Sequence, residues 1–151
     1  MRVVKAHPPS VLPVLPALVL AALLLPMAVP LARAGVIDPA YEAYLNSLPG
    51  DQKVSVLIYL ADQAPISQLD AELRAERATL SVRHETVITS LMDKAAETQP
   101  ALLAELAARQ DAGEAGGYTP YWIANLVVAQ MTVDAVREVA ARPEVGVVYS
   151  N

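Results

Sequence analysis

The sequence predicts an α+β fold in which helices pack on one side of a small sheet. Three apolar runs rich in β-branched residues, near residues 54–60, 118–131 and 145–149, indicate strands, and helical patterns lie between them. With 151 residues and no Cys, the chain is long enough for one ordinary domain and cannot be a disulfide scaffold.

The N-terminus has the composition of a targeting segment. Two basic residues precede an uncharged apolar run over residues 11–29, and small residues, Ala32 and Ala34, occupy the two positions that a signal peptidase inspects. We therefore expect a signal peptide over residues 1–34 with cleavage before Gly35. The mature protein would then be exported, as a secreted, periplasmic or cell-surface protein.

An uncleaved membrane anchor is the alternative interpretation of this leader, because about 20 apolar residues can span a bilayer. Four prolines weaken it, since each removes a helix hydrogen bond; they are Pro13, Pro16, Pro26 and Pro30. Under either interpretation the rest of the chain is delivered outside the cytoplasm, and a membrane is contacted only through the leader.

The remainder of the chain is acidic. Residues 35–151 carry eight basic and sixteen acidic residues, which gives a formal charge of −8. Sequence-independent binding to nucleic acid needs basic clusters that displace phosphate counterions. We therefore expect no nucleic-acid partner.

The first half of this remainder predicts a strand and a long helix. A lead-in segment over residues 35–53 has Tyr and Leu spacing that fits a short amphipathic turn. Residues 54–60, VSVLIYL, predict a central strand. Ser67, with Asp70 three positions later, resembles a capping box and predicts a helix from Ser67 to about Thr98.

The second half predicts two strands and two further helices. Pro100 suits the first turn of a helix that runs to Arg109. Residues 118–131 favour strands on either side of Asn125, because Asn tolerates left-handed conformations. Thr132 can cap a helix that precedes a short final strand.

The resulting order, β-α-β-β-α-β, predicts a ferredoxin-like two-layer sandwich with an antiparallel sheet and an extended helical insert after the first strand. Right-handed crossovers place both helical connections on the same side of the sheet. The other face would then lack helices, and an exposed apolar face commonly marks an interaction surface.

Groups that carry chemistry are scarce. Residues 35–151 contain one imidazole, His84, and no triad, zinc-binding or phosphate-loop motif accompanies it. The glycines of residues 113–117 follow a helix and lack the Lys of a phosphate loop. We therefore expect no catalytic residue, metal or cofactor. A hydrolase that uses His84 with Ser81 or Ser90 is the alternative, and it predicts loss of activity in His84→Ala.

Three segments together resemble the inhibitor I9 or propeptide domain of subtilisin-like serine proteases. Residues 54–60 resemble its first strand, and residues 121–129, YWIANLVVA, are similar to the Trp-Ile-x-Asn stretch of longer bacterial forms. Residues 131–148, MTVDAVREVAARPEVGVV, resemble its capped helix, Pro-containing corner and Val-x-x-Val strand. The helical insert over residues 67–109 resembles the enlarged forms. The resemblance covers residues 54–151, after the signal peptide and the lead-in segment.

This resemblance implies a non-catalytic inhibitor and intramolecular chaperone. In the family, the open sheet face packs on two surface helices of the protease, and the C-terminal tail lies in the substrate cleft by strand addition. By analogy, the sheet surface comprises Trp122, Ala124, Leu126 and Val128 or their alternating neighbours. The tail that approaches the cleft comprises Val147, Val148, Tyr149, Ser150 and Asn151.

The sequence departs from the family pattern at its end. Family precursors continue into a catalytic domain, whereas this sequence stops at Asn151, which leaves the cleft-directed tail short. The expected partner is a subtilisin-like protease in trans or a separated catalytic domain, and binding is better supported than inhibition. Two alternatives remain: an exported ferredoxin-like module that binds another protein or a small ligand, and a membrane-anchored structural protein.

Overall fold

The computed structural model describes residues 34–151, which form an α+β unit. Its sheet is open and contains β1 (Val36–Ile37), β2 (Lys53–Leu60), β3 (Ala115–Tyr121), β4 (Leu126–Thr132) and β5 (Val145–Ser150). Its helices are α1 (Pro39–Leu45), α2 (Ile66–Ala75), α3 (Leu80–Asp111) and α4 (Val133–Ala140). The strand order is β1-β5-β2-β4-β3, so β2 is the central strand, as the sequence predicts.

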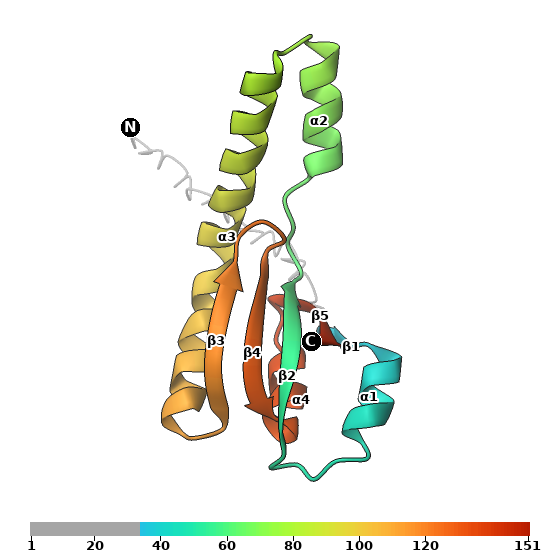
Figure 1. Ribbon diagram of the computed structural model, residues 1–151, viewed down its shortest axis with the longest axis vertical. Helices are drawn as coiled ribbons and strands as arrows, with labels where there is room; N and C mark the ends of the chain where they lie inside the picture. Colours follow the sequence, from blue (N-terminus) through green and yellow to red (C-terminus); the bar gives the residue numbers. More distant parts are fainter. Residues whose placement is uncertain (1–33) are drawn as a thin grey trace, which may run out of the picture. The chain divides into compact units, whose positions relative to one another are not determined.

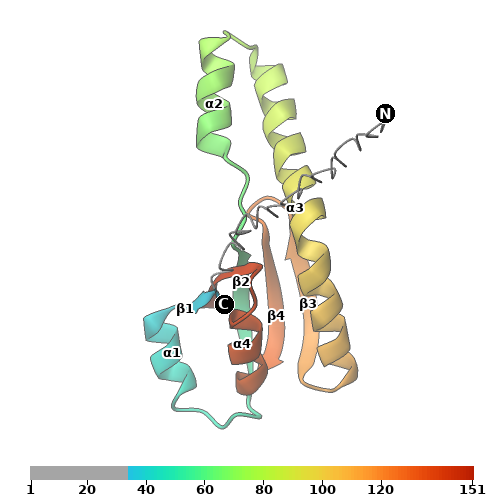
Figure 2. The ribbon, with the colours of Figure 1, turned by 180° about the vertical axis from the view of Figure 1, so that it is seen from behind.

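Helices cover one face of this sheet. In Figure 1 the strands lie in front of α4 and the C-terminal half of α3, and Figure 2 shows these helices from their own side. The core lies between the two layers and includes Ile58, Met131, Leu102, Leu106 and Val139. Within residues 34–151, no helix lies over the opposite face.

The sheet is mixed, and the expectation of an antiparallel sheet was wrong. β1 pairs parallel with β5, with Val36 opposite Val147, while the other strand pairs are antiparallel. A two-residue strand is too short to give a periodic sequence signal. The sequence therefore did not predict β1, which lies in the lead-in segment.

The lead-in segment is part of the fold. Asp38 caps α1 by accepting hydrogen bonds from the main-chain N–H groups of Ala40 and Tyr41, both at 3.1 Å. Tyr41 and Leu45 then enter the core. Burial raises the pKa of the Tyr41 phenol, and the neighbouring Tyr44 raises it further.

The helical insert divides at a place that the sequence did not indicate. α2 ends in a Schellman motif, in which Arg77 has a φ of 57° and the Ala78 N–H donates to the Leu73 carbonyl at 2.9 Å. Gly usually occupies this left-handed position, so the Arg gave no stop signal. Thr79 then caps α3 through a hydrogen bond from the Val82 N–H at 3.4 Å.

Two other helix predictions were wrong. Ser67 is not a cap: Pro65 precedes α2 at the N-cap, with no side-chain hydrogen bond there. Pro100 does not begin a helix, because α3 runs without interruption from Leu80 to Asp111 and contains it. α3 ends next to Gly113, whose φ is 78°, as the glycines near residue 113 predicted.

The insert extends beyond the sheet as a helical hairpin of α2 and the N-terminal half of α3 (Figure 1). Asp70 of α2 joins the two helices through an ion pair with Arg83 of α3, and it also pairs with Arg74 on its own helix. The hydrogen bond from Arg83, with a smaller contribution from Arg74, lowers the pKa of the Asp70 carboxyl against partial desolvation. No helix within residues 34–151 is both long and apolar enough to cross a membrane.

The β-hairpin of β3 and β4, and helix α4 after it, match the sequence prediction. Asn125 has a φ of 39° and ends the turn between β3 and β4. Thr132 caps α4, since its Oγ1 accepts from the Ala135 N–H at 3.3 Å. Both residues fix where the backbone changes direction.

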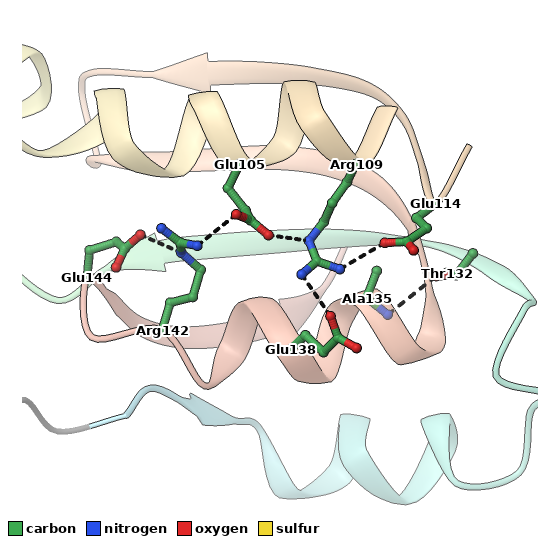
Figure 3. A network of polar contacts seen from close by, with 8 residues as sticks. All are labelled: Glu105, Arg109, Glu114, Thr132, Ala135, Glu138, Arg142 and Glu144. Carbon is green, nitrogen blue, oxygen red and sulfur yellow. Dashed lines mark hydrogen bonds and ion pairs between the residues drawn. The ribbon is translucent and has the colours of Figure 1, made fainter. Parts of the chain in front are cut away.

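Ion pairs join the covering helices to each other (Figure 3). Arg109 of α3 contacts Glu105 at 2.7 Å, Glu138 of α4 at 2.8 Å and Glu114 at 3.0 Å. Glu105 also pairs with Arg142, which follows α4, at 2.8 Å. This network links α3, α4 and the segment before β3.

Candidate protein-binding surface

The uncovered face of the sheet is built from every second residue of its strands. The register places Leu57 opposite Val128 and Tyr149, and Tyr59 opposite Leu126 and Val147. Because successive strand residues point to opposite faces, these side chains lie away from the core residues Val56 and Ile58. We call this set, with Val36, Thr119, Tyr121, Ser55 and Gln130, the open face.

The open face is mainly apolar and partly exposed to solvent. Tyr121 is 46% exposed, Tyr149 is 39% exposed and Val36 is 50% exposed. Tyr59 and Tyr149 contact each other edge to face, with ring centroids 5.8 Å apart. Among the strand residues on this side, the register places a single charge, Lys53, at the beginning of β2. Such a surface has the composition of an interface core.

The turn between β3 and β4 continues the open face at one end. Ile123 is 63% exposed, and together with Tyr121 and Ala124 it borders a shallow apolar recess over the sheet. Trp122, in contrast, lies beside α3, where it borders a groove with Met92 and other α3 residues. Side chains of the turn therefore reach both sides of the sheet.

Asn125 fixes this turn from inside the protein. Its side chain is buried, and its Nδ2 donates to the main-chain oxygen of Asp62 at 2.7 Å and to the Oγ1 of Thr98 at 2.9 Å. The Nε2 of Gln99 donates to its Oδ1 at 3.1 Å, and the Leu60 N–H donates to its main-chain oxygen at 3.1 Å. The turn is thus joined to α3 and to the end of β2.

Both edges of the sheet are poorly suited to adding another strand. β3 has a register irregularity between Ala115 and Tyr118, and Pro120 in it offers no N–H. At the other edge, β1 has two residues and is followed by Pro39. Short edges, bulges and prolines are the features that prevent edge pairing. The open face is therefore a better candidate for binding than the edges.

The four sheet residues suggested by the sequence lie in different places. Leu126 and Val128 are on the open face, and Ala124 borders the recess at its end. Trp122 is in the turn, beyond the last paired residue of β3, so strand alternation does not place it with the others. The structure brings three of the four together.

The tail residues suggested by the sequence belong mostly to β5. Val147 and Tyr149 lie on the open face, whereas Val148 is buried in the core and Ser150 ends the strand. Asn151 remains attached to β2, because its main-chain N–H donates to the Ser55 carbonyl at 3.2 Å and its Nδ2 donates to the Ser55 Oγ at 2.8 Å.

The suggested signal-cleavage site lies at the start of the described chain. Ala32 is outside the described residues, and Ala34 is exposed. Gly35 packs closely, since a Cβ at this position would lie 2.6 Å from the Val145 carbonyl oxygen. Only Gly fits this approach of two backbone segments.

Groups with catalytic chemistry are sparse in this part of the chain. His84 is exposed on α3, in the hairpin that extends beyond the sheet. No group of three or more His, Asp or Glu within residues 34–151 is placed to hold a metal ion. Lys94 pairs with Asp62 and Glu97 at 2.8 and 3.0 Å, and these hydrogen bonds raise its pKa.

Tyr121 and Ile123 are among the alternating neighbours that the sequence left open, whereas Leu57 and Tyr59 were not predicted for this surface. The signal that could have revealed them is the continuous apolar run of residues 54–60, without polar alternation. A strand with apolar residues on both sides presents an apolar surface on both faces of the sheet, including the face that the helices do not cover.

The comparisons with known proteins leave the family open. No family model matches the chain, and neither the curated proteins nor the solved structures contain a match. The resemblance to inhibitor I9 domains therefore rests on the residues of this chain.

Proposed function

We propose that this protein is an exported, non-catalytic binder of a subtilisin-like serine protease, which acts as a propeptide-type inhibitor, a folding chaperone or both. The observation that carries the proposal is the open face: a partly exposed apolar surface on a sheet whose other face is already packed. In the family that the sequence resembles, this face is the one that packs on the protease.

The strand order supports a ferredoxin-like architecture as part of this proposal. The strands after β1 lie in the order β5-β2-β4-β3. Each helical connection passes one neighbouring strand: α2 and α3 lead from β2 past β4 to β3, and α4 leads from β4 past β2 to β5. β1 adds a fifth strand to this arrangement.

Binding through the open face is better supported than cleft insertion. Asn151 holds the end of the chain on β2 through two hydrogen bonds to Ser55. To enter a substrate cleft as an added strand, the tail from Tyr149 would have to exchange these contacts for contacts with the protease. We therefore propose sheet docking as the main source of affinity, with inhibition depending on release of the tail.

The first test measures the residual activity of subtilisin on a small chromogenic peptide while the purified chain, secreted by a bacterial host, is added in rising amounts. We expect saturable inhibition with the added chain intact by mass spectrometry. The same spectra should show an N-terminus at Gly35. Rapid digestion without inhibition, and no improved refolding of the denatured protease, would contradict the proposal and favour a binding module unrelated to proteases.

A matched pair of variants locates the interface. Ile123→Ser removes an apolar side chain at the end of the open face, and Ile88→Ser makes the same change on α3, where Ile88 is 45% exposed. Ile123→Ser should weaken binding to the protease by about tenfold, because it loses one apolar contact of this size. Ile88→Ser should bind like the wild type. Equal effects of the two variants would place the interface elsewhere.

A further inference from the structure

The open face is hollowed at the turn between β3 and β4, where it forms the recess. It has a volume of about 220 Å³ and is lined by Leu57, Tyr121, Ile123, Ala124, Leu126 and Val128. These residues come from β2, β3, β4 and the turn, so the recess exists only when the sheet is assembled. The resemblance implies that Ala124, Leu126 and Val128 lie on the protease-binding surface, but it gives the recess that they border no role of its own.

The recess is built on a fixed frame. Its floor residue Leu126 is only 8% exposed, although it does not belong to the core on the helical side. Its outer wall, at Ile123 and Ala124, directly precedes Asn125, whose buried side chain is held by Asp62 and Thr98. A preformed site binds without the cost of ordering a loop.

The chemistry of the lining selects the occupant. No charged side chain borders the recess, and the only polar atom on a lining side chain is the Tyr121 hydroxyl. A charged or amide side chain placed here would lose its water without gaining a partner. An aliphatic side chain loses nothing on transfer and gains contact with four different elements.

We propose that this recess is the anchor site of the open face and receives one aliphatic side chain, of Leu, Ile or Met type, from the docked protease. The proposal rests on the proposed function, because the recess is continuous with the surface assigned to the protease. Energetically dominant contacts in interfaces commonly lie in well-packed pockets from which water is excluded, and the apolar lining of this recess favours an aliphatic occupant.

The test fills the recess. Ala124→Leu places an aliphatic side chain where the partner's would bind, and Ala124→Val is a smaller version of the same change. Ala101→Leu adds the same atoms at an exposed position on α3 and serves as the control. Binding of each chain to catalytically inactive subtilisin, with its nucleophilic Ser replaced by Ala, is measured by calorimetry.

We expect Ala124→Leu to raise the Kd at least about tenfold, Ala124→Val to raise it less, and Ala101→Leu to leave it within about twofold. Circular dichroism and the unfolding midpoint show that each variant is folded. If Ala124→Leu and Ala101→Leu bind alike, the recess is not an anchor.

A second measurement does not involve the protease. N-acetyl-leucine amide is titrated into the chain, and the methyl resonances of Leu57, Leu126 and Val128 are followed by NMR. Saturable shifts that disappear in Ala124→Leu support the recess even if subtilisin does not bind, in which case only the proposed function fails. Methyl resonances that do not move overturn the recess, and the protease assay then decides the proposed function separately.

Discussion

At the scale of the residue, Asn125 has two separate tasks. Its backbone takes a left-handed conformation that ends the hairpin turn, and its side chain satisfies polar groups of Asp62, Thr98 and Gln99. The first task follows from residue type, because Asn is one of the few residues that adopt this conformation readily. The second was not predictable, since its partners are separated from it by 26 to 63 positions in the sequence.

The two tasks can be separated by substitution. Asn125→Gly keeps the left-handed backbone without strain but removes the side-chain hydrogen bonds, whereas Asn125→Ala loses both. We expect Asn125→Ala to lower the free energy of unfolding by about 2–4 kcal/mol. The loss in Asn125→Gly should be smaller than the loss in Asn125→Ala by about 1–2 kcal/mol, because Gly adopts the left-handed conformation without strain. Urea denaturation followed by circular dichroism measures both.

If Asn125→Gly is more stable than Asn125→Ala, the left-handed backbone at this position contributes to the loss of stability in Asn125→Ala. Equal losses would mean that only the hydrogen bonds contribute. Gln99→Ala combined with Asn125→Gly gives the control: because these side chains share a hydrogen bond, their effects should not add.

At the scale of the element, α3 shows how a continuous helix can be mistaken for two. The sequence places Pro100 where a first-turn proline would fit, yet the structure places it in the interior, with twenty helical residues before it. Pro has no N–H, so the Ala96 carbonyl lacks its helical partner. Packing on the sheet through Leu102 and Leu106, both fully buried, stabilises the helix despite this loss.

Pro100→Ala distinguishes the two interpretations of α3. In a helix interior, Ala restores one hydrogen bond and removes a steric clash, so we expect the free energy of unfolding to rise by about 1–3 kcal/mol. At a first turn, the substitution would be neutral or slightly destabilising, because Pro is suited to that position. Thermal and urea unfolding of the two proteins decide between them, and an unchanged or lower stability would contradict a continuous α3.

At the scale of the whole molecule, the sequence predicted the strands better than it predicted their pairing and the side of the sheet that the helices cover. The strands near residues 54–60 and 145–149 are confirmed, because β-branched apolar runs bounded by turn residues are a strong local signal. The parallel pairing of β1 is non-local and gave no such signal. The open face was equally hidden: residues 54–60 are apolar on both sides, so composition could not show which side the helices cover.

The ion-pair network between α3 and α4 is also a property of the whole molecule, since its members lie in distant parts of the sequence (Figure 3). The Arg109 side chain is 13% exposed. Its desolvation tends to lower the pKa of the guanidinium, but hydrogen bonds to Glu138 and Glu105 outweigh this effect and raise it. Arg109 therefore stays charged, as arginine does in proteins, and its contribution to the free energy of unfolding should respond to salt.

Arg109→Met keeps the aliphatic stem and removes the charge that three carboxylates share. Because the site is partly buried, we expect the free energy of unfolding to fall by about 1–3 kcal/mol at low salt. The loss should shrink in 1 M NaCl, where the Debye length is about 3 Å. Arg137→Met is the control: Arg137 is 38% exposed, pairs with Asp134 at 3.3 Å and donates a hydrogen bond to the Asn46 side-chain oxygen at 3.0 Å, so removal of these exposed contacts should cost less than about 1 kcal/mol. If both variants lose the same stability at both salt concentrations, the network does not hold α3 against α4, and apolar packing alone keeps the two helices in place.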